Sequence, residues 1–154
     1  MSSERAKGIG MRRAFTIPEM LLVVAIIGII AAIGAPKIAT MIRHQRVNKA
    51  ASLVVADLQN VFAMAGRQRA PVHVAYDGVG LSYTFTDRKT GAVLQTRSLG
   101  STSEYSLTTL TFSPSVVDMF PNGIGSAPLT VTVGAGDYAR TVTASTAGFV
   151  RLVP

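Results

Sequence analysis

The chain has 154 residues, a formal charge of +7 and no cysteine. Without cysteine, a disulfide framework, a thiolate metal site and a thiol nucleophile are excluded. The length allows one apolar segment near the start and one small globular head. Four basic residues precede that segment, and the rest of the chain carries 11 basic and 7 acidic residues, a net charge of +4. This bias is well short of that of a nucleic-acid-binding tail.

Sixteen apolar or glycine residues follow one another from Met20 to Ala35. The basic residues before them predict a cytoplasmic N-terminus and an outward-facing C-terminal side. Three interpretations compete: a cleaved secretory signal, a plain membrane anchor and a more specialised segment. Pro36 would hinder signal cleavage after the small residues that precede it. As a helix, Ile17 to Ile38 would span roughly 30 Å, which matches a bilayer core.

Glu19 stands at the edge of this apolar run. An ionised acid near hydrocarbon is costly, so it is usually paired and functional where it persists. In a plain anchor the side chain would snorkel to the membrane surface. Alternatively, a free α-ammonium on Phe15 would lie about one helical turn from the carboxylate. Pairing of the two groups between staggered neighbouring helices would neutralise the acid and set the register of subunits.

The stretch Ala14-Phe15-Thr16-Ile17-Pro18-Glu19 resembles the processing site of type IV pilins and type II secretion pseudopilins. The resemblance implies that a prepilin peptidase removes residues 1–14 by cutting between Ala14 and Phe15, and that Phe15 is then N-methylated. It also implies an assembly role for Glu19, as the fifth mature residue, and for Thr16. Ala14 departs from the usual glycine but keeps its small size.

Gly28, Gly34 and Pro36 are predicted to weaken the first helix through backbone entropy and a lost hydrogen bond. Gly28 and Pro36 occupy the mature positions where the pilin family also has glycine and proline. In assembled pili of that family the corresponding stretch is partly extended. The alternative is that the small residues of this region pack against neighbouring helices.

A second, amphipathic segment from Lys37 to Ala65 has apolar residues three and four positions apart. The stripe predicts a stalk helix that ends at Gly66. An interruption near Pro36 is expected to separate it from the membrane segment. The rest of the chain is expected to pack against the apolar stripe. Its positions are Ile38, Met41, Ile42, Val47, Ala50, Ala51, Val54, Leu58, Val61, Phe62 and Ala65.

Residues 71–154 alternate between β-branched or aromatic residues and turn signals. About seven short strands are predicted, in residues 72–76, 81–87, 92–98, 106–113, 129–133, 139–145 and 149–153. Residues 113–127 are the loosest stretch. The expected fold is α+β and pilin-like: a transmembrane and assembly helix over residues 15–38, the stalk and its exit over 39–70, and a β-rich antiparallel head over 71–154.

The head resembles the GspH/FimT branch of minor pseudopilins and pilins. The similarity rests on residues 44–47, 65–72, the Phe-Pro-Asn-Gly turn at 120–123 and the closing segment 141–154. In DNA-binding FimT-like proteins a C-terminal Gly-Arg-x-Arg stretch is implicated. Here that stretch reads Gly148-Phe149-Val150-Arg151, and the missing arginine argues against DNA uptake.

No enzymatic motif is present. His44 and His73 have no nearby paired carboxylates in the sequence, and no phosphate-binding loop or His-Glu-x-x-His motif occurs. One aspartate is assigned to each of four turns: Asp77, Asp87, Asp118 and Asp137. No cofactor and no metal site are predicted, although calcium is bound in some pseudopilin heads.

The remaining candidate site is a basic surface formed by Arg43, Arg46, Lys49, Arg67, Arg69 and Arg151. Solvated or lipid-facing stalk residues, pairing between subunits and DNA binding all fit it. A membrane-anchored nucleic-acid-binding module is therefore the rival from another functional class.

The sequence thus predicts a non-enzymatic, GspH-like minor pseudopilin of a type II secretion system. It would be a single-pass inner-membrane protein with a periplasmic head, which meets prepilin peptidase, membrane lipid, other pseudopilins or pilins at a filament tip, and the inner-membrane assembly platform. The alternative is a FimT/FimU-like minor type IV pilin that acts in pilus assembly or DNA uptake.

Overall fold

The computed structural model describes residues 15–153. The predicted leader, including Ala14 of the expected cleavage site, lies outside the described residues, as does Pro154. The chain divides into two compact units, Met1–Ala39 and Thr40–Pro154. We refer to the second as the head unit.

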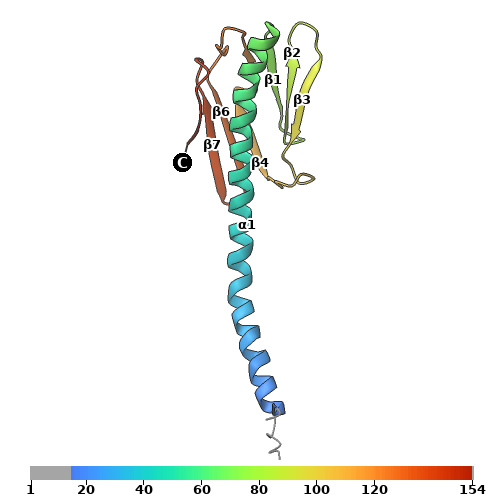
Figure 1. Cartoon of the computed structure of the whole chain (residues 1–154), viewed down its shortest axis with the longest axis vertical. Coiled ribbons are helices and arrows are strands. Elements are labelled where there is room, and N and C mark those ends of the chain that lie inside the picture. Colours follow the sequence, from blue (N-terminus) through green and yellow to red (C-terminus); the bar gives the residue numbers. More distant parts are fainter. Residues whose placement is uncertain (1–14, 154) are drawn as a thin grey trace, which may run out of the picture. The chain divides into compact units, whose positions relative to one another are not determined.

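Helix α1 (Ile17–Gln68) has 52 residues and is drawn in blue to green in Figure 1. The predicted interruption near Pro36 is wrong, because the helix continues through Gly34 and Pro36. A proline removes one backbone hydrogen bond, and it bends a helix as readily as it ends one. A weaker helix at this point stays a prediction, since continuity does not measure the stability of that turn.

The helix also ends later than predicted. Two residues beyond Gly66 are still helical, and Arg69 then follows with a φ of 50°. Glycine most often takes the left-handed conformation after a helix. In this chain arginine takes it instead, so the glycine rule placed the end two residues too early.

The head unit contains two four-stranded antiparallel sheets, ordered β3-β2-β1-β5 and β4-β6-β7-β8. The strands are β1 Val72–Asp77, β2 Ser82–Asp87, β3 Val93–Ser98, β4 Thr109–Ser113, β5 Val116–Met119, β6 Leu129–Ala135, β7 Tyr138–Ala144 and β8 Val150–Val153. The seven predicted strands are confirmed. Strand β5, inside the stretch predicted to be loosest, was missed because it has only four residues and pairs with the distant β1.

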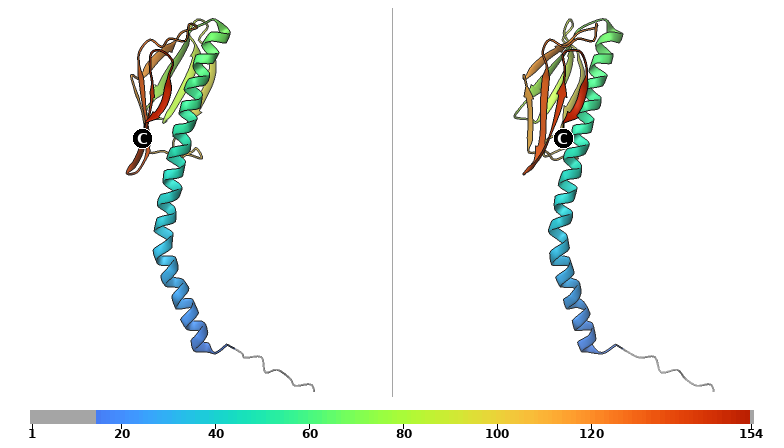
Figure 2. Two further views of the ribbon diagram at one scale, coloured as in Figure 1. Left: turned by 60° about the vertical axis from the view of Figure 1, so that its left-hand side comes forward. Right: turned by 90° about the vertical axis from the view of Figure 1, so that its left-hand side faces the viewer.

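The head unit's part of α1 buries an apolar stripe against strands of both sheets (Figures 1 and 2). The predicted stripe is confirmed from Val47 to Ala65, where its main positions are at most 1% exposed. Ile38, Met41 and Ile42, also predicted in it, are 59%, 62% and 44% exposed. The apolar stripe is therefore buried only from Val47 onward, and each large side chain buried there contributes about 1.5–3 kcal/mol.

Gly148 joins two turns of the head unit. It has a φ of 80°, and an added Cβ would lie 3.0 Å from the carbonyl oxygen of Gly123. Gly148→Ala should therefore lower the free energy of unfolding by more than the ~1–2 kcal/mol cost of a left-handed non-glycine residue. Gly91→Ala is the control, because Gly91 has a φ of 72° with no described atom within 4 Å of the added Cβ. Equal losses in thermal unfolding would contradict the close contact.

Candidate functional site

The start of α1 is closed by a reciprocal pair of hydrogen bonds. The backbone N–H of Thr16 donates to Glu19 Oε2 at 3.5 Å, and the backbone N–H of Glu19 donates to Thr16 Oγ1 at 3.4 Å. This is a capping box, which satisfies two N–H groups that the first helical turn leaves unpaired. The Thr-x-x-Glu spacing is typical of a capping box, but the sequence analysis did not predict one. Glu19 therefore has a local role in addition to any role between chains.

Phe15 lies two residues before the first helical residue, Ile17. Phe15 therefore lies outside the helix, whereas residues 15–38 were predicted to form the assembly helix. The capping box explains this position, because Thr16 is the N-cap residue of the helix and Phe15 precedes the N-cap. Both Phe15 and Glu19 are exposed, so each is accessible to another chain.

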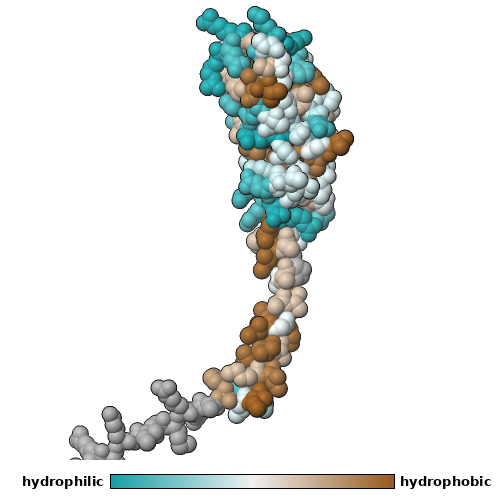
Figure 3. All heavy atoms as spheres, turned by 90° about the vertical axis from the view of Figure 1, so that its right-hand side faces the viewer, coloured by the Kyte–Doolittle hydropathy of each residue, from teal (hydrophilic) through white to brown (hydrophobic). Residues whose placement is uncertain are grey.

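The apolar part of α1 is exposed along its length. Within the described residues, α1 is the one helix long and apolar enough to cross a membrane. Figure 3 shows the apolar colour gathered on this part of the helix, while polar residues dominate the visible face of the head unit. At Gly28 and Gly34 an added Cβ would have no described atom within 4 Å. Packing of these glycines against other helices stays a prediction.

Asp57 is the buried acid of the head unit, and the sequence interpretation did not single it out. It is 5% exposed. Its carboxylate accepts hydrogen bonds from Tyr83 Oη at 2.7 Å, Gln95 Nε2 at 3.1 Å, and Arg97 Nε and Nη2 at 2.8 and 3.1 Å. Burial alone would raise the pKa of Asp57, but these hydrogen bonds and the charge of Arg97 together hold the pKa below its usual range. Burial and the Asp57 charge raise the pKa of Tyr83.

This network ties α1 to β2 and β3, and its role is structural. Asp57 lies three residues after Val54 and four before Val61, both of which are buried. These spacings place it on the buried side of the helix. An acid within an apolar stripe could have indicated a buried polar site in the sequence. The partners of Asp57 could not be predicted, because they come from strands 26 to 40 residues away.

A second polar cluster joins α1 to the β6–β7 hairpin. Asn48 Oδ1 accepts hydrogen bonds from Tyr138 Oη and Arg140 Nε, both at 3.0 Å. The rings of His44 and Tyr138 stack with centroids 4.0 Å apart. His44, for which the sequence predicted no partner, therefore packs between α1 and the β6–β7 hairpin.

His73 has a carboxylate partner, contrary to prediction. Its Nδ1 lies 2.8 Å from Asp118 Oδ1, and Arg88 Nη1 lies 3.1 Å from Asp118 Oδ2. Asp118 was assigned to a turn, but it belongs to β5 and pairs across strands with His73. The error follows from missing β5. Within residues 15–153, no group of three or more His, Asp or Glu side chains could hold a metal ion.

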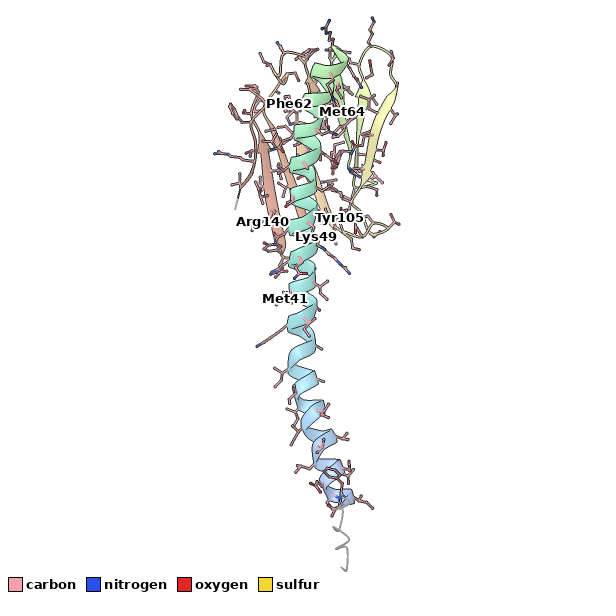
Figure 4. The ribbon with its side chains drawn as sticks, viewed as in Figure 1. Met41, Lys49, Phe62, Met64, Tyr105 and Arg140 are labelled. Carbon is pink, nitrogen blue, oxygen red and sulfur yellow. The ribbon has the colours of Figure 1, made fainter. Side chains whose placement is uncertain are left out.

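The structure places five of the six predicted basic residues in two groups along or just after α1, and Arg151 separately on β8. Arg43, Arg46 and Lys49 lie near the start of the head unit's helix, whereas Arg67 and Arg69 lie at its end. At 1.5 Å per residue the helix separates the groups by roughly 35 Å. Arg46 and Lys49 line a hollow of about 170 Å³ with Tyr105, and Figure 4 labels Lys49 and Tyr105 side by side. Arg151 lies on β8 and lines a different groove.

No protein-family model and no curated protein matches the chain. Among solved structures, the type IV minor pilin FimU of Pseudomonas aeruginosa matches with a TM-score of 0.59 and 20% identity, over 71% of this chain and 90% of that one. A second crystal form of FimU matches with a TM-score of 0.55 and 21% identity, over 70% and 92% of the two chains. The minor pseudopilin EpsH of the Vibrio cholerae type 2 secretion system matches with a TM-score of 0.57 and 19% identity, over 70% and 96%. The predicted pilin-like α+β fold is confirmed, and this chain shares it with minor pilins and pseudopilins.

Proposed function

We propose that the chain is a minor pseudopilin, similar to GspH, in the pseudopilus of a type II secretion system. Its role is mechanical: it is stored in the inner membrane by α1 and joins a short filament that serves protein export across the outer membrane. One observation carries the proposal. A head with this fold follows an apolar helix that starts two residues after Phe15 and holds Glu19 in its first turn.

Assembly would use the exposed start of α1. Prepilin peptidase removes residues 1–14, and the new α-amino group of Phe15 is methylated but keeps its positive charge. The Glu19 carboxylate of an adjacent subunit neutralises it in an environment of low dielectric constant, where an unpaired charge is costly. The Thr16–Glu19 capping box satisfies the same carboxylate while the subunit is stored as a monomer.

A minor type IV pilin similar to FimT or FimU is the second candidate. FimU matches with TM-scores of 0.59 and 0.55 in its two crystal forms and EpsH with 0.57, so likeness of fold supports both candidates equally. DNA capture is the weaker part of this alternative, because Phe149 stands where an arginine is expected and the basic residues are spread over α1, its end and β8.

Mass spectrometry of the full chain, expressed with its own peptidase, tests the proposal. The expected mature chain begins with N-methylphenylalanine at residue 15, and it is recovered with sheared filaments. A chain that keeps residues 1–14 in cells with active peptidase would refute the proposal. Deletion of the gene then separates the two filaments: loss of secreted enzymes supports the pseudopilus, and loss of surface pili or DNA uptake supports the type IV pilus.

A further inference from the structure

Four strands lie at sheet edges in the described head unit: β3 and β5 in the first sheet, and β4 and β8 in the second. An edge strand carries backbone N–H and C=O groups without a partner in its sheet, so it can pair with another chain. The edge of β5 is covered by the loop that follows it. The backbone N–H of Ser126 donates to Asp118 O at 2.8 Å, and Met119 forms a β-bridge with Gly125.

The edges of β4 and β3 are modified in other ways. On β4, the Leu110 carbonyl oxygen accepts a hydrogen bond from the Tyr76 hydroxyl of the first sheet. Beside β3, the register with β2 shifts between Phe85 and Thr86, and such an irregularity disrupts the ladder. These edges are therefore poorer templates for a further strand than β8.

The backbone of β8 is open on one side. The backbone N–H of Ser145 donates to Phe149 O at 2.9 Å, so these two residues form a hydrogen-bonded pair with β7. Pairing alternates along an antiparallel ladder, so the backbone groups of Arg151 also face β7, whereas those of Val150 and Leu152 face outward. Within residues 15–153, these outward groups have no hydrogen-bond partner.

The side chains of Phe149 and Arg151 lie on one face of the strand, because the residues are two positions apart. Phe149 is 78% exposed. An open, mostly apolar groove of about 400 Å³ is lined by both residues and by Pro128, Thr130 and Thr143. Arg151 makes no ion pair with any described residue. The open edge thus adjoins an aromatic side chain, an apolar groove and a free positive charge.

We infer that β8 binds an extended segment of a different protein, which adds to the second sheet as an antiparallel strand. An acidic residue of that segment lies opposite Arg151, and an apolar residue two positions later lies opposite Phe149. In strand addition the backbone hydrogen bonds supply affinity, and sites for alternate side chains supply specificity. The residue opposite Arg151 falls in a non-hydrogen-bonded pair, where side chains lie closest and the charges meet.

An extended peptide fits these features better than a nucleic acid does. It uses the outward backbone groups, the apolar groove and the charge of Arg151 together, whereas a phosphate backbone would use the charge alone. The contact lies within the head unit, so the inference goes beyond the proposed filament function and does not rest on it.

Fluorescence polarisation with the full chain in detergent micelles tests the strand addition. The probe is a fluorescein-labelled peptide, Ser-Thr-Asp-Thr-Leu-Thr-Ser, whose Asp and Leu are placed to face Arg151 and Phe149. Its central Thr then lies opposite Val150 and donates its N–H to β8. N-methylation of this Thr should abolish binding, whereas N-methylation of the Leu, whose N–H faces away from β8, should leave the affinity unchanged. Equal affinities of the two methylated peptides, or no binding of the unmethylated peptide, would overturn the inference.

A double-mutant cycle tests the charge pair. Arg151→Gln in the chain and Asn for Asp in the peptide should each weaken binding about fivefold, and the two together should weaken it no further. Lys89→Gln is the control, because it removes one positive charge from an exposed turn of the first sheet and should leave the affinity unchanged. Additive losses, or an equal loss with Lys89→Gln, would overturn the pairing in chains that melt like the wild type.

A fluorescein-labelled DNA duplex is titrated in parallel. Binding of the duplex without binding of the peptide would overturn the inference and assign the groove to nucleic acid. These measurements need no filament, so their failure leaves the proposed function standing. An unprocessed chain in the mass-spectrometric test would in turn leave the peptide contact standing.

Discussion

A Glu19→Ala chain is expected to be cleaved before Phe15 and to be lost from sheared filaments. Cleavage should persist because the proposed cut, between Ala14 and Phe15, precedes the helix that carries Glu19. Incorporation should fail because the methylated amino group of the neighbouring subunit would enter the apolar environment with no carboxylate to neutralise it. Immunoblots of membrane and sheared fractions measure the two outcomes separately.

Two further variants separate pairing from helix capping. Thr16→Val removes the hydroxyl that accepts the Glu19 N–H, which costs about 1 kcal/mol of cap stability but leaves the carboxylate in place. Its incorporation should fall only partly. Glu19→Gln keeps the size of the side chain and loses its charge, so it should behave like alanine in assembly. Normal incorporation of Glu19→Ala or Glu19→Gln would contradict the charge-pairing mechanism.

Asp57→Ala is expected to lower the free energy of unfolding of the head unit by about 3 kcal/mol, because breaking a buried, hydrogen-bonded ion pair strands its partners. The variant leaves the Tyr83 hydroxyl buried without its acceptor, and Arg97 without its 2.8 Å partner. Chemical denaturation of the full chain in detergent, followed by far-ultraviolet circular dichroism, measures the loss.

Two controls bracket this effect. Tyr83→Phe removes a single donor to Asp57 and should cost about 1 kcal/mol. Asp137→Ala removes an acid whose side chain is 86% exposed and lies 3.9 Å from Arg43, so its effect should stay within about 0.5 kcal/mol. An Asp57→Ala loss no larger than that of Asp137→Ala would show that the network does not hold helix and sheet together.

The same carboxylate makes stability depend on pH. The pKa of Asp57 is lower in the folded head than the value near 3.9 expected for an unfolded chain. Its contribution is therefore complete above the unfolded pKa and is lost as the pH falls through the folded pKa. The stability difference between wild type and Asp57→Asn should be constant above about pH 5 and should shrink at lower pH.

Local patterns determined much of this protein. The apolar run, the amphipathic stripe from Val47 to Ala65 and seven alternating strands were readable because each follows a period of the chain itself. The motif around Glu19 was recognised from its resemblance over residues 14–19 to a pilin processing site, and its role stays a prediction. The capping box of Thr16 and Glu19 was also present in the sequence, although it was overlooked.

Tertiary structure alone decided the features that depend on distant partners. Strand β5 exists through its pairing with β1, and it brings Asp118 to His73. The partners of Asp57 lie up to 40 residues away, and five of the six basic residues fall in two groups because the helix separates them. Periodicity reports which face of an element is buried, but not which element covers it, and that choice set the polar networks and surfaces of this head.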